Sequence, residues 1–318
     1  MVVEIALAVA VLIIGIVLMA YSSEKAVGHS IRIATALRVS PLVIGLILVS
    51  IGTDLPEIVN SITSSAIGHG DINVGDSLGS ALTQMTLILG LIPFLAGDLR
   101  VKKREVLVIG ACEVLALILT VSMAEKGYFT RINALFLMAI WIVLILLAKS
   151  VMEKDDEEKK WLMPSANGRL RQNLLDWIIA ILGFVGVAIG SYAVVQSVIM
   201  LSASFNIAEY IVSFFIVAIG TSLPELVVTI SALRRKEYAL SIGNVIGSCL
   251  FDASFSVGIG LFFFPQAISG ELATYTGLYA IFGSIFAIFV LALNGKVDKK
   301  SGSLFILVYL LSYSLMTA

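Results

Sequence analysis

Apolar residues occupy this chain in long uninterrupted runs, and most charged residues are gathered between the runs. A helix that crosses a bilayer needs about 20 consecutive apolar residues. The runs are continuous rather than alternating, so the pattern predicts membrane-spanning helices and not a strand barrel. With soft ends, ten runs meet the requirement: 2–20, 40–66, 72–96, 105–124, 131–149, 174–200, 208–233, 239–264, 272–293 and 302–317.

The composition agrees with an all-α polytopic membrane protein whose surface lies in the lipid bilayer. The 318 residues are 59% hydrophobic and 14% charged, with a mean hydropathy of +1.02. A soluble domain carries about 25% charged residues. The net charge of −1 gives no indication of nucleic-acid binding. Cys112 and Cys249 fall inside predicted spans, where we expect small packing residues and no disulfide.

The distribution of basic residues predicts an orientation. Of the 21 Lys and Arg, 19 lie in the loops that follow the odd-numbered runs, whereas the opposite side has only Lys126 and Arg131. The positive-inside rule places the basic side in the cytoplasm, with both termini outside and the protein in the plasma membrane. The longest loop, at about 150–173, holds DDEEKK and GRLR. We interpret it as a solvated linker in preference to a regulatory module.

The chain contains an internal duplication. Residues 45–84 align with residues 213–252 at a constant offset of 168 without gaps, and 13 of the 40 positions are identical. The identities include residue types that chance similarity of apolar segments would not preserve together. They are Gly52/Gly220, Thr53/Thr221, Leu55/Leu223, Pro56/Pro224, Glu57/Glu225, Gly75/Gly243, Gly79/Gly247 and Ser80/Ser248, among others.

The duplication predicts two five-span halves, 1–150 and 174–318, joined by the linker 151–173. Because five is odd, the second half enters the membrane from the opposite side, which makes an inverted repeat. Secondary transporters often have this plan, with their sites near the bilayer midplane at broken helices in matching positions. The matching positions here are the second and seventh runs, and the third and eighth.

The first repeated motif, GTDLPE and later GTSLPE, combines a helix breaker with an acidic residue. Pro56 has no N–H for the carbonyl of Gly52, so an oxygen is freed close to Glu57. Thr53 lies one helical turn from Glu57, on the same face. Intramembrane carboxylates are functional candidates, and Glu57 and Glu225 would repel each other unless a cation lay between them. Hard oxygen ligands of this kind suit Ca²⁺ and Na⁺.

The second repeated motif, GDSLGSALTQ and later GNVIGSCLFD, adds oxygen ligands. Ser80 precedes Gln84 by one turn, and Ser248 precedes Asp252 by one turn. The small residues also allow close helix approach. Asp76 stands near the predicted start of its helix, so a role at the helix N-terminus and a role in the site both stay open.

A polar stripe also follows the second run. It comprises Ser50, Asn60 or Ser61, and Ser64. The stripe could line a water-filled path or make hydrogen bonds between helices, and the sequence favours neither.

These motifs resemble the signature repeats of the cation/Ca²⁺ exchanger superfamily, in particular its prokaryotic Na⁺/Ca²⁺ exchanger-type members. The resemblance covers the whole ten-span plan. It implies an antiporter that exchanges Ca²⁺ for Na⁺ by alternating access and has no cofactor. It also implies that the first and sixth spans slide against the other helices. The sequence indicates no oligomeric state, and we expect a monomer to function.

The resemblance also implies ligands for the transported cations. Glu57 and Glu225 would hold Ca²⁺ with the backbone oxygens of Thr53 and Thr221. Na⁺ sites would use Ser80, Ser248, Ser222 and the backbone oxygens of Ser50 and Ala218, and Asp252 with the position of Gln84 would complete the cluster. The first repeat departs from the family pattern, because Asp54 stands where Ser is usual, Asp76 where Asn is usual, and Gln84 where Asn or Asp is usual.

Several alternatives stay open at this point. A carboxylate at Asp54 could carry a proton, so H⁺ coupling competes with Na⁺ coupling. A K⁺-assisted variant and other divalent substrates, such as Mg²⁺ or Mn²⁺, are also compatible with the motifs. We rank an intramembrane aspartyl protease and a passive channel below an antiporter, because the segment VGDS is a poor match to a protease motif.

Overall fold

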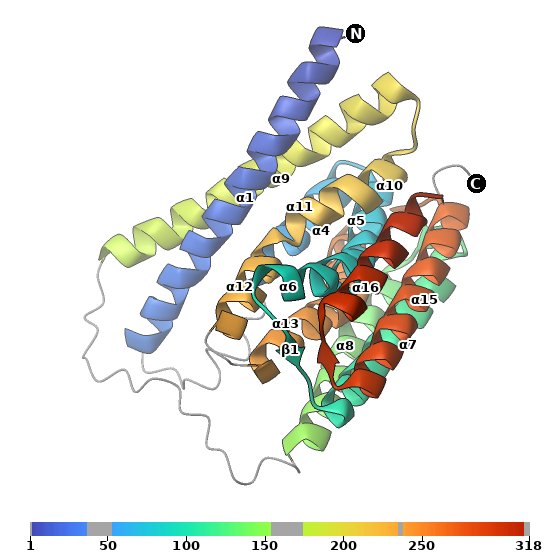
Figure 1. Cartoon of the computed structure of the whole chain (residues 1–318). Coiled ribbons are helices and arrows are strands. Elements are labelled where there is room, and N and C mark those ends of the chain that lie inside the picture. Colours follow the sequence, from blue (N-terminus) through green and yellow to red (C-terminus); the bar gives the residue numbers. More distant parts are fainter. Residues whose placement is uncertain (1, 37–52, 154–173, 235–237, 315–318) are drawn as a thin grey trace.

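The fold is a helical bundle. The structure, a computed structural model, describes residues 2–36, 53–153, 174–234 and 238–314. Figure 1 shows long inclined helices with short connections. The first part of the chain forms α1 (Val2–Ala36), α4 (Leu55–Ala66), α5 (Gly70–Leu82), the π-helical segment η2 (Thr83–Ile88), α6 (Leu89–Leu95), β1 (Leu99–Arg100), α7 (Lys103–Ala124), β2 (Tyr128–Phe129) and α8 (Arg131–Glu153).

The second part of the chain repeats this order of elements. It forms α9 (Leu174–Phe205), α10 (Glu209–Val212), the π-helical η3 (Ser213–Val217), α11 (Ala218–Thr221), α12 (Leu223–Arg234), α13 (Tyr238–Phe251), the π-helical η4 (Asp252–Ser256), α14 (Val257–Phe263), β3 (Gln266–Ala267), α15 (Gly270–Asn294), β4 (Lys296–Val297) and α16 (Lys299–Ser312). The offset of 168 that relates the two motifs also relates η2 to η4, β1 to β3 and β2 to β4.

The helices of the described residues suit a membrane. Seven of them are long and apolar enough to cross one: Val3–Ala26, Gly70–Leu95, Lys103–Ala124, Leu174–Phe205, Glu209–Ile230, Ser241–Phe263 and Gly270–Asn294. A shorter apolar helix covers Arg131–Leu147. The first part of the second predicted run 40–66, residues 40–52, lies outside the described residues.

The first helix is longer than the sequence predicts. The run 2–20 was expected to end in a loop, but α1 continues to Ala36. Its second half is stabilised by α9: Ser22, Ser23 and Ala26 are buried, and His29 Nδ1 lies 2.7 Å from Asp176 Oδ1. Polar residues therefore extend this helix because a neighbouring helix gives them contacts.

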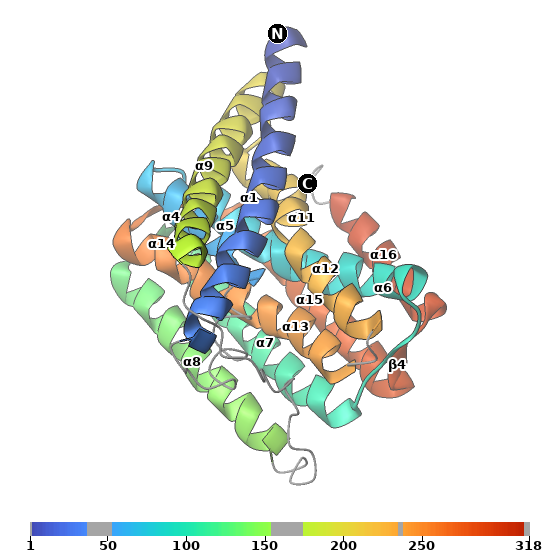
Figure 2. The same ribbon diagram turned by 90° about the vertical axis from the view of Figure 1, so that its left-hand side faces the viewer.

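Helices α1 and α9 pack side by side and face the viewer in Figure 2. Glycines allow the two backbones to approach closely. A Cβ atom on Gly183 would lie 2.7 Å from Ala26 N, and one on Gly190 would lie 2.8 Å from Gly15 O. Gly15, early in α1, lies opposite Gly190, and Ala26, later in α1, lies opposite the earlier residue Gly183. The two helices therefore run antiparallel. Small residues at such an interface are typical of helix association in membranes.

Short strands connect the two parts of the chain. β1 pairs antiparallel with β4, with Leu99 opposite Val297. β2 pairs antiparallel with β3, with Tyr128 opposite Ala267. Each pairing joins a connection of the first part to a connection of the second. Next to β4, the Asp298 carboxylate caps α16 by accepting a hydrogen bond from Ser301 N (3.0 Å), and this bond lowers the pKa of Asp298.

The two parts pack unequally around the centre. In the first half, α4 packs extensively against both α14 and α9. In the second half, the equivalent helix α12 makes few contacts with the equivalent partners, α6 and α1. At the contact of α4 with α14, Gly260 N donates a hydrogen bond to Ser61 Oγ (3.1 Å). A Cβ atom on Gly260 would lie 2.1 Å from the carbonyl oxygen of Ser61. The bundle is therefore tightly closed on this side.

Candidate functional site

Two matched helix breaks form the centre of the bundle. Asp54 precedes α4 with φ −83° and ψ 10°, and Ser222 separates α11 from α12 with φ −80° and ψ 6°. The breaks coincide because the residue two positions later, Pro56 or Pro224, has no N–H to continue the helix. The prediction that the motif interrupts a helix is confirmed for the second copy, where α11 and α12 flank Ser222. In the first copy α4 begins after Asp54, and Ser50 and Gly52 lie outside the described residues.

Glu57 and Glu225 occupy the first turns of α4 and α12. Their side chains are 1% and 0% exposed. All four carboxylate oxygens lack a hydrogen-bond partner in the part of the chain that the structure describes. Glu57 is also repelled by Glu225, Asp252, Asp76 and Asp54. Buried carboxylates without donors need a positive charge or a proton nearby, so the arrangement has the chemistry of a cation site.

Asp54 projects into the same cluster. It is 2% exposed and lies close to the Ser248 hydroxyl and the Glu225 carboxyl group. Its Oδ1 atom has no partner among the described residues. Two carboxyl groups in contact require a shared proton or a cation. The matching residue Ser222 is neutral and accepts a hydrogen bond from Gln84 Nε2 (3.3 Å).

Gln84 and Asp252 meet at the centre although they lie 168 residues apart. Gln84 Nε2 donates to Asp252 Oδ2 at 2.9 Å, and Cys249 Sγ donates to Gln84 Oε1 at 3.2 Å. Both side chains start from π-helical segments, η2 and η4. Such segments are common at functional sites because the extra residue changes the direction of the side chains. Both Cys112 and Cys249 are unpaired, as predicted.

Asp76 is a connecting residue of the cluster and does not cap its helix. It lies in the middle of α5, accepts a hydrogen bond from Asn60 Nδ2 (2.6 Å) and accepts another from Thr221 Oγ1 (3.0 Å). Ser80 Oγ is 3.4 Å from the same Thr221 Oγ1. The possibility that Asp76 acts at the helix N-terminus is therefore wrong. Its match, Asn244, instead donates to the Glu225 carbonyl (3.2 Å).

The polar stripe on α4 makes contacts between and within helices. Asn60 bonds to Asp76, Ser61 accepts from Gly260, and Ser64 Oγ donates to the Asn60 carbonyl (2.6 Å). These bonds favour the interhelical interpretation for Asn60 and Ser61. Ser50, the fourth member, is not among the described residues.

Glu113 is a buried carboxylate that the sequence interpretation did not select. It lies in the middle of α7 and is fully buried. Ser284 Oγ of α15 donates to its Oε1 atom at 2.7 Å. The signal that could have found it is the same one that selected Asp252, namely a carboxylate inside an apolar run.

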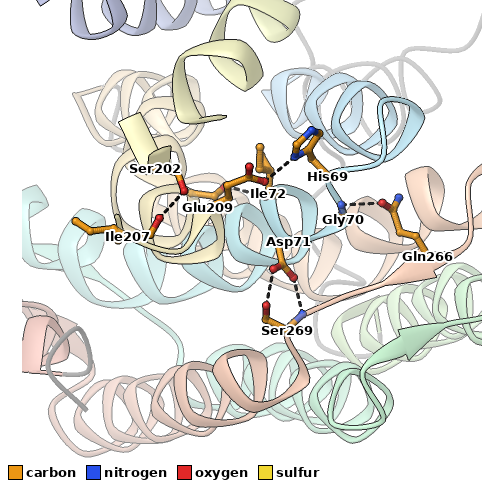
Figure 3. A network of polar contacts seen from close by, with 10 residues as sticks. His69, Gly70, Asp71, Ile72, Ser202, Ile207, Glu209, Gln266 and Ser269 are labelled. Carbon is orange, nitrogen blue, oxygen red and sulfur yellow. Dashed lines mark hydrogen bonds and ion pairs between the residues drawn. The ribbon is translucent and has the colours of Figure 1, made fainter. Parts of the chain in front are cut away.

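A second polar network lies at one end of the bundle (Figure 3). His69 Nδ1, in the turn between α4 and α5, is 2.6 Å from Glu209 Oε2 at the start of α10. Gly70 N donates to Gln266 Oε1 (2.9 Å), and both the backbone N–H and the hydroxyl of Ser269 donate to Asp71. Three connections, 67–70, 206–208 and 264–269, are thus held together.

The acidic cluster is not a complete metal cage. Within the described ranges, no three His, Cys, Asp or Glu side chains converge closely enough to hold a metal ion by themselves. Hydroxyl and carbonyl oxygens would have to supply the other ligands, as hard cations permit. The residues predicted to supply such groups, among those described, are all buried: Thr53, Ser80, Ala218, Thr221, Ser222 and Ser248.

The fold and this cluster together define a class: helical membrane transporters with a buried acidic centre at paired helix breaks. The chain belongs to the sodium/calcium exchanger protein family, whose model matches residues 7–149 and 175–318. The family is one of transmembrane antiporters, which points to a transporter rather than an enzyme. The predicted membership of the cation/Ca²⁺ exchanger superfamily is confirmed.

Relatives and solved structures match along most of their length. The inner membrane protein YrbG of Escherichia coli is 30% identical over 296 residues, which is 90% of this chain and 88% of that protein. The sodium/calcium exchanger MaX1 of Methanosarcina acetivorans is 25% identical over 94% of this chain and 95% of its own. A structure of the sodium-calcium exchanger NCX_Mj, soaked with Na⁺ and Sr²⁺, superposes with a TM-score of 0.62 at 25% identity and covers 98% of this chain and 99% of that one.

Proposed function

We propose that the protein exchanges Ca²⁺ for Na⁺ across the plasma membrane, with the cations bound between the two halves of the chain. One observation carries this proposal: Glu57 and Glu225 stand at matched helix breaks, fully buried and without hydrogen-bond donors. Ca²⁺ suits such a pair, because its two positive charges balance two carboxylates and it prefers oxygen ligands. Relatives named as sodium/calcium exchangers support the choice of ions.

The ligands in this proposal are those that the resemblance to the family implies. Glu57 and Glu225 would hold Ca²⁺ together with the backbone oxygens of Thr53 and Thr221. Na⁺ would use Ser80, Ser222, Ser248 and the carbonyl oxygens of Ser50 and Ala218. Asp252 and Gln84, which are joined by a hydrogen bond, would close the centre.

Asp54 is the feature that separates this chain from the family pattern. Its carboxyl group lies beside Ser248 and Glu225, where a neutral serine would only solvate a cation. A carboxylate there strengthens cation binding and also gives a proton a place to bind. Coupling to H⁺, or assistance by K⁺, is therefore the second candidate.

The transport cycle we propose is alternating access by two inverted five-span halves, 1–150 and 174–318, with ten spans in all. The glycine-rich contact between α1 and α9 suits two helices that slide as a pair. The unequal packing of α4 and α12 against the other half suits one state of a two-state cycle. Exchanging these two sets of contacts would open the site to the other side of the membrane.

The orientation proposed from the basic loops puts both termini outside and the linker 151–173 in the cytoplasm. The network of His69, Glu209, Asp71 and Gln266 would then lie at the outer face. A single chain contains both halves of the site, so the proposed functional unit is the monomer.

Purified protein in proteoliposomes tests the proposal. An outward Na⁺ gradient should drive Ca²⁺ uptake, and Glu57→Gln or Glu225→Gln should abolish uptake in folded protein. Uptake that ignores Na⁺ but follows a pH gradient would replace Na⁺ by H⁺. Near-normal uptake in both variants would refute the site, and unitary currents in a planar bilayer would indicate a channel.

A further inference from the structure

Glu113 is a buried acid with one hydrogen bond and no role in the proposed site. Its side chain is fully buried. Its Oε1 atom accepts a hydrogen bond from Ser284 Oγ at 2.7 Å, and its Oε2 atom has no partner in the described part of the chain. A serine hydroxyl is a neutral donor, so it cannot balance the charge of an ionised carboxylate.

No basic side chain faces Glu113 from the described parts of the elements that pack on α7. Helices α13 and α15 and the segment η4 contain no Lys, Arg or His. Arg131 lies at the first residue of α8, and Lys103 and Arg104 lie at the first turn of α7, far along the helix from its middle. The remaining ionisable groups on these elements whose side chains the structure describes are acidic, phenolic or thiol: Glu105, Cys112, Tyr128, Tyr238, Cys249, Asp252, Glu271, Tyr275 and Tyr279. Lys149 and Glu153, near the end of α8, have side chains outside the described part of the structure.

An isolated carboxylate in such surroundings loses its hydration without compensation, and the usual response is to take up a proton. We propose that Glu113 is a proton-binding site beside the cation centre, protonated when the centre is empty and ionised more readily when the centre holds a cation. This proposal rests on the proposed function, because the coupling is to cation binding. Ionisation breaks the O–H bond of the carboxylic acid and passes one proton to the buffer.

Contacts link this position to the centre. Helix α13 packs on α7, and its Cys249 donates to Gln84 Oε1 (3.2 Å). Gln84 in turn donates to Asp252 (2.9 Å). Thr120, two turns after Glu113 on α7, donates to the carbonyl of Ala253 in η4. Helix α7 is thus attached directly to the segment that carries Asp252.

The sign of the coupling follows from charge. An ionised Glu113 adds a negative charge near the centre and increases its affinity for cations. By reciprocity, a bound cation favours ionisation of Glu113 by the same factor. Ca²⁺ affinity should therefore rise with pH, and part of that rise should come from Glu113.

Three variants separate this role from packing. Glu113→Gln has the shape of the protonated acid and cannot ionise. Ser284→Ala removes the one hydrogen bond that Glu113 Oε1 accepts among the described residues. Glu105→Gln, on the same helix but paired with Lys102 at 2.8 Å, is the matched control.

The first experiment measures Ca²⁺ binding by calorimetry at several pH values in two buffers of different ionisation enthalpy. The wild type should release more protons per Ca²⁺ than Glu113→Gln. As the pH rises through the titration of Glu113, the Ca²⁺ affinity of the wild type should increase about fivefold more than that of Glu113→Gln. This factor is the lower end of ordinary coupling between two sites. Glu105→Gln should match the wild type. Equal proton release and equal pH dependence in the wild type and Glu113→Gln would overturn the coupling.

The second experiment uses infrared spectroscopy of the cation-free wild type, which does not depend on folding of a variant. A carboxylic-acid C=O band should be present, should shift in Ser284→Ala and should vanish in Glu113→Gln. Absence of any such change would overturn the protonated state. Failure of the proposed function is distinguishable, because the wild type would then show no Ca²⁺ binding while the infrared band of Glu113 persisted.

Discussion

Gln84 and Asp252 occupy equivalent positions in the two halves of the chain, and the amide of one donates to the carboxylate of the other at 2.9 Å. Cys249 Sγ and the Ala81 carbonyl, also 168 residues apart, lie 3.7 Å from each other. Equivalent residues can touch only where they lie on the axis that relates the halves. The contact therefore supports the proposed two-fold relation of the halves, with an axis between α5 and α13.

This contact predicts the effect of removing the amide. Gln84→Leu leaves Asp252 Oδ2 without its donor inside a buried contact. We expect a loss of about 1–3 kcal/mol in the free energy of unfolding, the usual cost of an unsatisfied buried group. Thermal unfolding in detergent measures it. Gln84→Glu, of nearly the same shape, is the comparison, and an unchanged midpoint for Gln84→Leu would show that the pair is not buried in solution.

The paired glutamates predict how Ca²⁺ stabilises the fold. A ligand at 100 times its Kd stabilises the native state by about 2.7 kcal/mol. Ca²⁺ should raise the unfolding temperature of the wild type but not of Glu57→Gln or Glu225→Gln. Glu271→Gln, at the start of α15 and far from the centre, should respond like the wild type. Retained stabilisation in both centre variants would place the Ca²⁺ site elsewhere.

Asp54 predicts a change in the driving ion. Asp54→Ser would make the first helix break resemble the second, with its Ser222. We expect Ca²⁺ affinity to change little, and the dependence of transport on Na⁺ and pH to change several-fold. Flux measured across a matrix of Na⁺ concentrations and pH values tests this, with Ser222→Asp as the reciprocal variant. Identical dependences in the wild type and Asp54→Ser would make Asp54 irrelevant to coupling.

The contact of α4 with α14 predicts a graded steric effect. A Cβ atom at Gly260 would lie 2.1 Å from the Ser61 carbonyl oxygen, so even alanine forces the helices apart. Gly260→Ala should destabilise the protein by about 1–3 kcal/mol, the usual cost of overpacking. Gly260→Val should cost more. Thermal unfolding and transport rate should change together, and a stable, fully active Gly260→Val would show that this contact opens readily.

The network in Figure 3 predicts a small, measurable coupling. His69 and Glu209 are about one-quarter exposed, with side-chain values of 29% and 25%, so solvent screens the pair. A double-mutant cycle of His69→Ala and Glu209→Ala should give a coupling energy of at most about 1 kcal/mol. A coupling several times larger would mean that this contact is a main determinant of the position of α10 and not a minor contribution to it.

Much of the fold and of the centre could be predicted because the polar motifs occur in two copies. Proline and glutamate at a fixed offset of 168 identified both helix breaks and both glutamates. Glu113 was not predicted, because it lies outside the repeated motifs and the residue 168 positions later is Ile281. The roles of Asp76 and Asn60 could not be predicted, because their hydrogen bonds depend on how α4, α5 and α11 pack.

Other features depend on geometry that a single sequence does not encode locally. The π-helical segments η2, η3 and η4 have no distinctive residue pattern, and they arise where close packing forces an extra residue into a turn. The extension of α1 to Ala36 depends on α9, which lies more than a hundred residues later. The hydropathy of the local sequence predicts an end at residue 20, because local hydropathy contains no information about packing against α9.

The crossed strand pairs have a consequence for how the molecule is assembled. β1 with β4 and β2 with β3 each tie a connection of one half to a connection of the other, and none of the four strands belongs to the linker sequence. The peptide link between the halves is therefore topologically dispensable. Two polypeptides divided within the linker and produced from separate genes should therefore assemble into the same molecule, held by these strand pairs and by the helix contacts between the halves.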